Sequence, residues 1–349
     1  MNILITGNMG YVGSVLVKHL KSDEQNSKLI GFDTGYFQNC LTSTKIPPEK
    51  NIDYQFIGDI REISPGILQG IDHIVHLAAI SNDPIGNEFE DITMSVNYNS
   101  TAKLAEYAIA AGVKSFTFAS SCSVYGNATL EDKTETSLVN PLTAYANSKV
   151  NAEEKLKELA CKNFKVTCFR FATACGMSDR LRLDLVLNDF VASALASNKI
   201  EILSDGSPWR PLINVEDMAR ALHWGINRQI EETNEFMIIN AGKNENNIQI
   251  KELAGLVKEN IPSVNIEINK NAQPDKRSYK VDFSLFNTLA DKKYLPQKSL
   301  DETISELNSE LKRMNFADKN FRTSELIRLQ KIKNLRTQQK LNENLQWVS

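Results

Sequence analysis

The sequence lacks the features that mark membrane, nucleic-acid-binding and disulfide-rich proteins. Its 349 residues contain no uninterrupted apolar stretch of membrane-spanning length. The formal net charge is −3, so there is no basic excess of the kind that binds nucleic acid. The five cysteines are scattered, without metal-type clustering, and their odd number fits reduced thiols. The first residues predict a strand and not a signal peptide. We therefore expect a cytoplasmic protein that binds no metal, no membrane and no nucleic acid.

A glycine-rich turn follows the first predicted strand. Met1–Thr6 is a short apolar run typical of a buried parallel strand, and it leads through Gly7, Gly10 and Gly13 into a helical pattern at Ser14–Leu20. In a dinucleotide-binding turn, such glycines permit the tight turn, the close approach of a pyrophosphate and the packing of helix on strand. The helix N-terminus adds N–H groups and a partial positive charge. The alternative is a glycine-rich turn without a ligand.

The strands that follow predict where a dinucleotide would lie. Lys28–Phe32 ends at Asp33, where an acidic side chain can hydrogen-bond ribose hydroxyls and repel a 2′-phosphate, which favours NAD over NADP. Asp59 follows the third predicted strand and is placed to meet the adenine. Ile74–Ala79 is a fourth strand, whose small last residues would let the cofactor lie across it. We interpret His76, inside this apolar run, as a packed core histidine.

Tyr145 and Lys149 are the most informative pair of the chain. They lie four residues apart in a run of helix-forming residues, so both side chains are expected on one helix face. A free tyrosine has a pKa of about 10, and a neighbouring ammonium would lower the pKa of Tyr145 and let it remove a proton from an alcohol. Ser121, past the predicted strand Ser115–Ala119, would face the ligand crevice and hold a substrate hydroxyl. The alternative interpretations are that Ser121 lies in an ordinary polar turn and that the spacing of Tyr145 and Lys149 arises by chance.

With these motifs the chain resembles the extended short-chain dehydrogenase/reductase family, and within it the nucleotide-sugar epimerases and dehydratases, over residues 1 to about 300. The resemblance implies a catalytic triad of Ser121, Tyr145 and Lys149, bound NAD, and a homodimer formed through helices such as Met94–Ala111. The implied NAD-binding residues are Gly7, Gly10, Tyr11, Val12, Gly13, Asp33, Asp59, Ile60, Leu77, Ala78, Ala79, Asn97, Ser120, Tyr145, Lys149 and Phe171.

The predicted fold is α/β, a Rossmann-type doubly wound parallel sheet with a smaller C-terminal substrate-binding domain. Strand and helix patterns alternate through about residue 176, and a length of 349 residues suits two domains. We assign 1–176 to the NAD-binding domain, with a returning segment at about 211–241, because Leu212–Trp224 and Phe236–Ala241 look like a return to the main sheet. Residues 177–210 and 242–349 form the predicted substrate-binding domain.

The resemblance implies a nucleotide-diphosphate sugar as substrate. Arginines suit a diphosphate because the planar guanidinium binds phosphate oxygens in pairs, although without the resemblance each would more readily be a surface charge. Arg180 and Arg182 lie in a charged stretch, Asp179–Asp184, that is either a sugar-contacting loop or the solvated start of a helix. The predicted substrate-binding residues are Ser121, Cys122, Ser123, Arg180, Arg182, Asn188, Arg210 and Arg277.

Departures from the family pattern narrow the predicted reaction. The 4,6-dehydratases carry an Asp and a Glu where this chain has Cys122 and Ser123, and the glutamate of the sugar-acid decarboxylases is also missing. We interpret Cys122 as a small packed thiol. The segment is most similar to the 4-epimerases, which predicts an NAD-dependent epimerase acting at C4 through a transient keto-sugar. A 4-ketoreductase, a lyase using Cys122 as acid, and a non-catalytic NAD-binding protein stay open.

The sequence continues past a minimal epimerase. From Ser299 onward it is polar and helical, and Leu326, Leu329, Ile332, Leu335 and Leu341 recur near helical spacing. This extension is predicted either to pack on the substrate-binding domain or to bind a second subunit.

Overall fold

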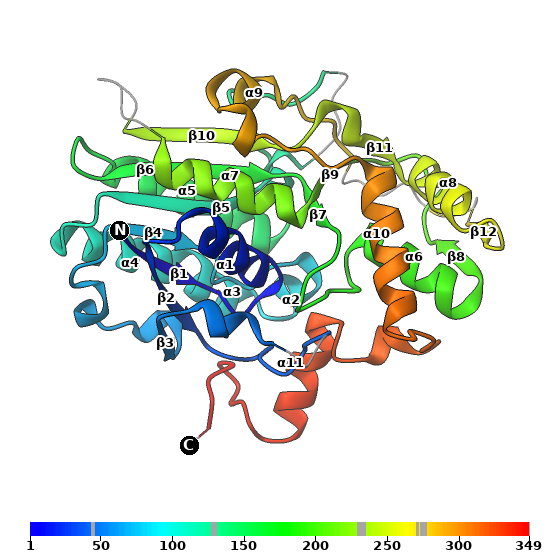
Figure 1. Cartoon of the computed structure of the whole chain (residues 1–349), viewed down its shortest axis with the longest axis horizontal. Helices are drawn as coiled ribbons and strands as arrows, with labels where there is room; N and C mark the ends of the chain where they lie inside the picture. The colour runs from blue at the N-terminus through cyan, green and yellow to red at the C-terminus, as the bar shows by residue number, and fades with distance from the viewer. Residues whose placement is uncertain (43–45, 127–130, 229–234, 270–271, 273–277, 349) are drawn as a thin grey trace.

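A parallel β-sheet forms the centre of the molecule. The structure is a computed structural model that describes residues 1–42, 46–126, 131–228, 235–269, 272 and 278–348. The sheet has seven strands in the order β10-β6-β5-β4-β1-β2-β3, and every neighbouring pair is parallel (Figure 1). The strands are β1 (Asn2–Thr6), β2 (Lys28–Asp33), β3 (Tyr54–Ile57), β4 (His73–His76), β5 (Ser115–Ser121), β6 (Lys165–Phe171) and β10 (Phe236–Ala241). The predicted α/β, doubly wound fold is confirmed, and the direction of winding reverses between β1 and β4, where such sheets bind ligands.

Helices α1 (Tyr11–Asp23) and α7 (Val215–Asn227) cover one face of the sheet. Leu16 and Leu20, which lie four residues apart on α1, share a buried cluster with Leu222 of α7 and with the side chains of β1. The spacing of the two leucines places both on the same side of α1, so the helix that begins at the glycine turn is held against the sheet.

The opposite face is covered by α4 (Ser100–Ala110) and α5 (Ala144–Leu159). Leu104 and Leu156 from these helices pack with Phe116 of β5 in a second buried cluster. Helix α5 therefore lies directly along β5, the strand that ends at Ser121. The shorter elements of this half are α2 (Asp83–Glu88), α3 (Glu90–Met94), a π-helical turn (Ser95–Asn99) and single 3-10 turns at Pro48–Asn51, Ile60–Glu62, Pro65–Leu68 and Cys122–Tyr125.

The second half of the chain forms a smaller unit with its own core. A three-stranded sheet in the order β11-β9-β7 and a two-stranded pair, β12 and β8, carry helices around them. The strands are β7 (Thr173–Cys175), β8 (Lys199–Ile202), β9 (Trp209–Asn214), β11 (Asn247–Gln249) and β12 (Asn265–Ile268). The helices are α6 (Val186–Ser197), α8 (Ile250–Asn260) and α10 (Leu300–Arg313), with 3-10 turns at Asn244–Asn246 and Phe321–Thr323. Helix α9 (Ser284–Leu289) and the 3-10 turn Lys292–Tyr294 instead pack on the main sheet, against β10 and α7.

The predicted return to the main sheet is only partly correct. Phe236–Ala241 does join it, as β10 beside β6. Residues 212–214 instead belong to β9, which pairs with β7 and β11. Because β7 leaves the main sheet directly after β6, its partner β9 stays in the smaller unit, and only the following helix α7 packs back on the sheet.

The end of the chain packs on the nucleotide-binding half. Helix α11 (Arg328–Thr337) and the residues after it lie below β2 and β3 in Figure 1, where they are coloured red. Ile332 and Leu345 share a buried cluster with Ile80, Ile85 and Phe89. The extension from Ser299 was expected on the substrate-binding domain or on a second subunit. Its first part does pack on that domain, through α10 and through Leu326, whose carbonyl accepts from the Leu183 nitrogen at 3.0 Å, whereas α11 and the residues after it contact the first half of the chain.

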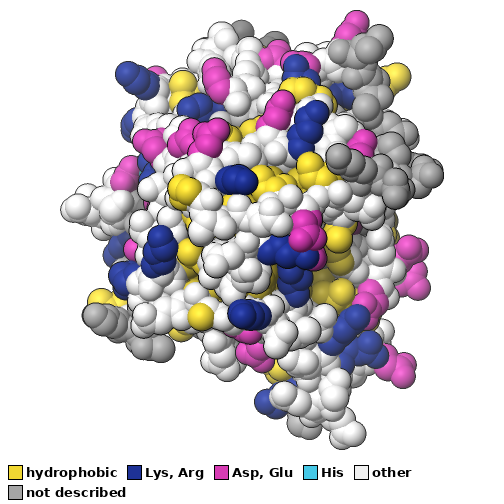
Figure 2. Space-filling view, turned by 90° about the vertical axis from the view of Figure 1, so that its right-hand side faces the viewer, with side chains coloured by type: hydrophobic (Ala, Val, Ile, Leu, Met, Phe, Trp, Pro, Cys, Tyr) yellow, Lys and Arg dark blue, Asp and Glu magenta, His cyan; other side chains and the backbone are white. Residues whose placement is uncertain are grey.

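The surface carries charges of both signs. On the face shown in Figure 2, Lys and Arg side chains alternate with Asp and Glu, and apolar side chains lie in hollows near the middle. Within the described part of the chain, no helix combines the length and the apolar character needed to cross a membrane.

Candidate active site

A cavity of about 970 Å³ opens at the carboxyl ends of the main-sheet strands. The smaller unit and the end of the chain complete its walls. This is the size of a small-molecule site. The predicted site residues that line it are Gly7, Gly10, Tyr11, Val12, Gly13, Asp33, Asp59, Ile60, Leu77, Ala78, Ala79, Ser120, Ser121, Ser123, Tyr145, Lys149, Phe171, Arg182 and Arg210. Asn97, Cys122, Arg180 and Asn188 lie outside the lining, and Arg277 falls outside the described residues.

The glycine turn is packed so closely that only glycine fits. Gly7 has a φ of +77°, and a Cβ there would lie 2.6 Å from the Ala78 nitrogen. A Cβ on Gly13 would lie 2.3 Å from the Gly7 carbonyl oxygen, which fixes α1 on the turn. Helix α1 begins at Tyr11 with no acidic residue in its first turn, and its N-terminus borders the cavity. This arrangement fits the pyrophosphate of a dinucleotide.

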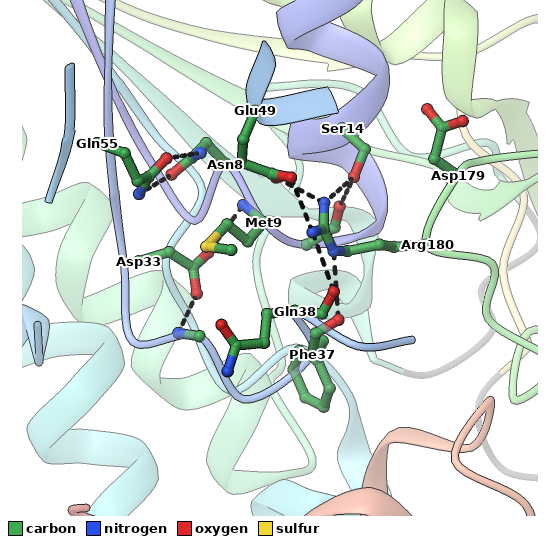
Figure 3. Close-up of polar contacts among 12 residues, drawn as sticks. Asn8, Met9, Ser14, Asp33, Phe37, Gln38, Glu49, Gln55, Asp179 and Arg180 are labelled. Atoms are coloured by element: carbon green, nitrogen blue, oxygen red, sulfur yellow. Dashed lines mark hydrogen bonds and ion pairs between the residues drawn. The ribbon is translucent and has the colours of Figure 1, made fainter. Parts of the chain in front are cut away.

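Asp33 is held at the end of β2 by two backbone N–H groups. Its Oδ2 accepts from the Met9 nitrogen at 3.0 Å and its Oδ1 from the Gly35 nitrogen at 2.8 Å (Figure 3). Burial raises the pKa of Asp33, while these two hydrogen bonds oppose the rise. The carboxylate keeps lone pairs for the hydroxyls of a ribose. Asp59, at the end of β3, accepts from Arg61 Nε at 2.9 Å and also lines the cavity. The residues present therefore fit a dinucleotide cofactor.

Tyr145 and Lys149 occupy the first turns of α5, which Thr143 caps by accepting from the Ala146 nitrogen at 3.1 Å. Ser121, the last residue of β5, lies close enough to the Tyr145 hydroxyl to lower its pKa. Lys149 Nζ donates to the Ala119 carbonyl at 2.8 Å and lies 5.6 Å from the centre of the Tyr145 ring. The structure thus brings all three predicted triad residues to one wall of the cavity.

The pKa of Tyr145 differs from the sequence-based expectation. Burial raises it to about 12, and the neighbouring Ser121 side chain and the charge of Arg182 offset only part of that rise. The expected lowering by Lys149 is not seen. Burial also lowers the pKa of Lys149 to about 8, and its ammonium group is already hydrogen-bonded to a carbonyl. Sequence spacing placed the pair correctly, but solvent exclusion sets the sign of the shift.

Two contacts position Tyr145, and the sequence analysis missed the first of them. The first is Gly86 of α2, where a Cβ would lie only 3.2 Å from the Tyr145 Cβ. The second runs through Asn97, whose amide donates to Ser148 Oγ at 3.0 Å and exchanges hydrogen bonds with the backbone of Ile80 at 2.8 and 3.0 Å. Asn97 sits in the π-helical turn and ties the loop after β4 to α5. It supports the site from behind, without lining the cavity.

Cys122 points away from the cavity. Its side chain is 1% exposed, and Sγ donates to the Arg170 carbonyl at 3.1 Å. Burial raises the pKa of this thiol well above its usual range. The interpretation of Cys122 as a packed thiol is confirmed, whereas its predicted contact with substrate has no geometric support. Ser123 does face the cavity, and no described group hydrogen-bonds its buried hydroxyl.

His76 and Asn188 hold the structure in place around the site. His76 is buried between Thr6 Oγ1 at 2.6 Å and Thr101 Oγ1 at 2.8 Å, and burial lowers its pKa to about 3, which confirms its interpretation as a core residue. Asn188 is fully buried, accepts from the Gly176 nitrogen at 2.9 Å and donates to the Arg182 carbonyl at 2.9 Å. It shapes the loop before α6 and does not reach the cavity.

The structure places the side chains of Arg180 and Arg182 in different surroundings. Arg180 is 1% exposed and forms a two-pronged ion pair with Glu49 at 2.7 and 3.0 Å. It also donates to the carbonyls of Phe37 and Gln38, both at 3.2 Å (Figure 3). The predicted substrate contact of Arg180 is therefore not formed, because Glu49 binds its guanidinium outside the cavity. Arg182 does line the cavity, where Asp184 accepts from its Nε at 2.9 Å.

The cavity has a second polar end in the smaller unit. Arg210 of β9 lies there with Ser204 and Tyr279. Arg322, which the sequence analysis missed, pairs with Asp189 of α6 at 2.7 Å in the same wall. Other lining residues that were missed come from the end of the chain, among them Arg328, Ile332 and Leu345. Helical spacing had singled out Ile332, but spacing does not say which surface a helix covers.

This chain is similar in sequence and fold to several known proteins. The family model described as "NAD dependent epimerase/dehydratase family" matches residues 3–242. The curated Bacillus subtilis (strain 168) protein "Uncharacterized UDP-glucose epimerase YtcB" is 28% identical over 231 residues, 64% of this chain and 71% of its own. UDP-glucuronic acid decarboxylase 6 of Arabidopsis thaliana is 27% identical over 293 residues, 81% of each chain. The solved structure of UDP-glucuronic acid 4-epimerase from Bacillus cereus, with UDP-glucuronic acid and NAD, is 23% identical and covers 90% of this chain and 100% of its own, with a TM-score of 0.74.

Proposed function

The chain belongs to the NAD dependent epimerase/dehydratase family, and within that family we propose that it is a nucleotide-sugar epimerase acting at C4. Its cofactor is NAD. One observation carries the proposal: Ser121, Tyr145 and Lys149 meet in one cavity wall beside the glycine turn, and the Cys122 that replaces a dehydratase carboxylate points out of that cavity. The similar proteins include an epimerase and a decarboxylase, so the choice between reactions depends on these residues.

Each side chain has a role that its position supports. Tyr145 is the group that takes the proton of the C4 hydroxyl and later returns it, and Ser121 holds the sugar oxygen beside the tyrosine hydroxyl. NAD, when bound, supplies the hydride acceptor at C4 and the positive charge of the nicotinamide ring. Because burial raises the pKa of Tyr145 to about 12, proton removal needs a cationic neighbour, and Arg182 provides one from this chain.

Epimerisation also needs an anchor, since the keto-sugar must present its other face while the nucleotide stays bound. Arg210 and Arg322 line the cavity in the smaller unit, away from the glycine turn. Asp189 holds Arg322 in place at 2.7 Å. These arginines are proposed to bind the diphosphate of the nucleotide sugar, because a guanidinium can bind two phosphate oxygens at once.

A second candidate is a dehydratase-like lyase, favoured by one carboxylate. Asp83 lines the cavity, accepts from Thr143 Oγ1 at 2.7 Å, and its charge contributes to the raised pKa of Tyr145. A carboxylate in this wall can serve proton transfer at a carbon next to C4. A 4-ketoreductase would use the same triad. It is distinguished from an epimerase by its need for added reduced coenzyme.

The test is proton NMR of the purified protein in deuterated water with UDP-, dTDP-, CDP- and GDP-sugars and no added coenzyme. An equilibrium between two C4 epimers without deuterium at any sugar carbon is expected, because the same hydride leaves and returns. Loss of water, with deuterium entering at carbon, would establish the lyase. Turnover of keto-sugars only, and only with added NADH or NADPH, would establish the reductase. Tyr145→Phe is the matched control and should lower the rate by about 10²- to 10⁴-fold.

A further inference from the structure

The end of the chain forms part of the wall of the NAD cavity. We call residues 328–348 the C-terminal cover. Trp347 Nε1 donates to the Thr34 carbonyl at 2.6 Å, and the Tyr36 hydroxyl donates to the Leu345 carbonyl. Gln346 Nε2 donates to Glu62 Oε1 at 2.9 Å. The first two contacts hold the cover on the loop that directly follows Asp33, beside the expected position of the adenosine, and the third holds it on the 3-10 turn Ile60–Glu62.

Arg328 is the charged residue that the cover brings deepest into the protein. Its side chain is 2% exposed, and its guanidinium carbon lies 4.4 Å from the centre of the Phe37 ring. Nη2 donates to the Arg180 carbonyl at 2.7 Å. Nη1 is buried and has no hydrogen-bond partner among the described residues, although Arg328 lines the cavity. A buried guanidinium with an unsatisfied N–H group is costly unless a ligand satisfies it.

The charges around Arg328 indicate an anionic ligand. Three arginines meet here: Arg180 is paired with Glu49 and Arg182 with Asp184, but no described carboxylate forms an ion pair with Arg328. Burial, and next the charge of Arg182, lower the pKa of Arg328 to about 10. An anion in the cavity would raise the pKa of Arg328 back toward its usual value.

We propose that Arg328 binds the pyrophosphate of NAD and that the C-terminal cover holds the dinucleotide in its cavity. The same wall presents the N-terminus of α1, and Arg180, to whose carbonyl Arg328 donates, reaches Ser14 of α1 at 3.4 Å. A nucleotide-sugar diphosphate is the other source of the same chemistry. It is the weaker choice here, because the polar end formed by Arg210 and Arg322 lies in the smaller unit. The proposal depends on NAD binding and not on which sugar is turned over.

The experiment compares ligands that differ by a diphosphate. Wild type, Arg328→Met, Arg328→Lys and the control Lys333→Met are purified, and their NAD content is measured. Lys333 lies on the same helix but pairs with Glu88 at 2.8 Å and is exposed. After removal of NAD, calorimetry measures the Kd of ADP-ribose, adenosine and UDP. Arg328→Met should weaken ADP-ribose binding by about 10- to 100-fold and lower the NAD content, since one charge-assisted hydrogen bond is lost. Adenosine, UDP and the control should change less than about twofold.

Two outcomes would overturn the proposal. One is an equal loss of adenosine and ADP-ribose binding, which means that Arg328 only maintains the fold. The other is weakened UDP binding with ADP-ribose unchanged, which assigns Arg328 to the sugar nucleotide. If Arg328→Met does not fold, Arg328→Lys decides, because it keeps the charge and loses the planar fork. Its ADP-ribose affinity must then fall relative to adenosine, while thermal unfolding without ligand matches the wild type.

Discussion

The ion pair between Arg180 and Glu49 leads to a prediction that separates stability from substrate binding. Arg180 was a candidate for contacting the sugar, and the structure places it 1% exposed outside the cavity, against Glu49 at 2.7 and 3.0 Å. The changes are Arg180→Met, Glu49→Gln and the double variant. The matched variant is Arg182→Met, which removes the same charge from the cavity wall two residues away.

The size of the effect follows from what each change leaves buried. Glu49→Gln leaves the guanidinium of Arg180 without its carboxylate, and breaking a buried pair in this way costs about 3 kcal/mol. Arg180→Met removes the donors of the hydrogen bonds to the Phe37 and Gln38 carbonyls, whereas Glu49, near the surface, can be hydrated again. The cost of Arg180→Met is therefore about 2–4 kcal/mol. Each single variant should lower Tm by about 3–5 °C. The double variant should cost less than the sum by about 1–3 kcal/mol.

The assay is thermal unfolding followed by circular dichroism at matched NAD concentration, because bound cofactor raises Tm by mass action. The Kd of UDP is measured alongside, together with KM for the sugar that turns over. Arg180→Met should unfold earlier with Kd and KM changed less than about twofold, and Arg182→Met should show a raised KM. A raised KM with unchanged Tm in Arg180→Met would refute the structural assignment of Arg180.

Three further predictions concern the glycine turn, the thiol and the lysine. Gly13→Ala should yield protein that retains no NAD and is less stable by at least about 3 kcal/mol, because the added Cβ would lie 2.3 Å from the Gly7 carbonyl; purified, stable, NAD-loaded protein would contradict this. Cys122→Ser should turn over within about threefold of wild type, since Sγ faces the Arg170 carbonyl; loss to background would favour the lyase. Burial lowers the pKa of Lys149 from 10.5 to about 8, so the unfolded chain binds more protons than the folded chain between these pH values. Urea unfolding should therefore show the stability of wild type rising relative to Lys149→Met from pH 8 to 10.5, and a flat difference would disprove the shift.

The parts of the site that the sequence predicts are those whose signal is local. The glycine turn, Asp33 at the end of a strand, and the spacing of Tyr145 and Lys149 each depend on a few neighbouring residues. Strand, turn and helix geometry converts that spacing directly into position. The α/β fold follows from the same alternation of strand and helix patterns.

The parts that the sequence does not predict are set by partners far along the chain. Glu49 lies 131 positions from the Arg180 that it binds, and Arg328 meets the Arg180 carbonyl across 148 positions. No local pattern distinguishes an arginine in such a pair from one that faces a ligand. The pKa of Tyr145 is of the same kind, because burial by the surrounding chain decides its direction and helical spacing does not.

The position of Trp347 makes its fluorescence a probe of the oxidation state of the bound cofactor. Its indole nitrogen is hydrogen-bonded to Thr34, the residue after Asp33, so this ring stands beside the dinucleotide cavity, whereas Trp209 lies in β9 and Trp224 in α7. Tryptophan emission overlaps the absorption band of reduced nicotinamide, and that of the oxidised form much less. In the proposed reaction, Trp347 emission should therefore be quenched during the half of the cycle in which the cofactor holds the hydride. The duration of a transient fall in tryptophan emission would then give the lifetime of the reduced cofactor, without any added label.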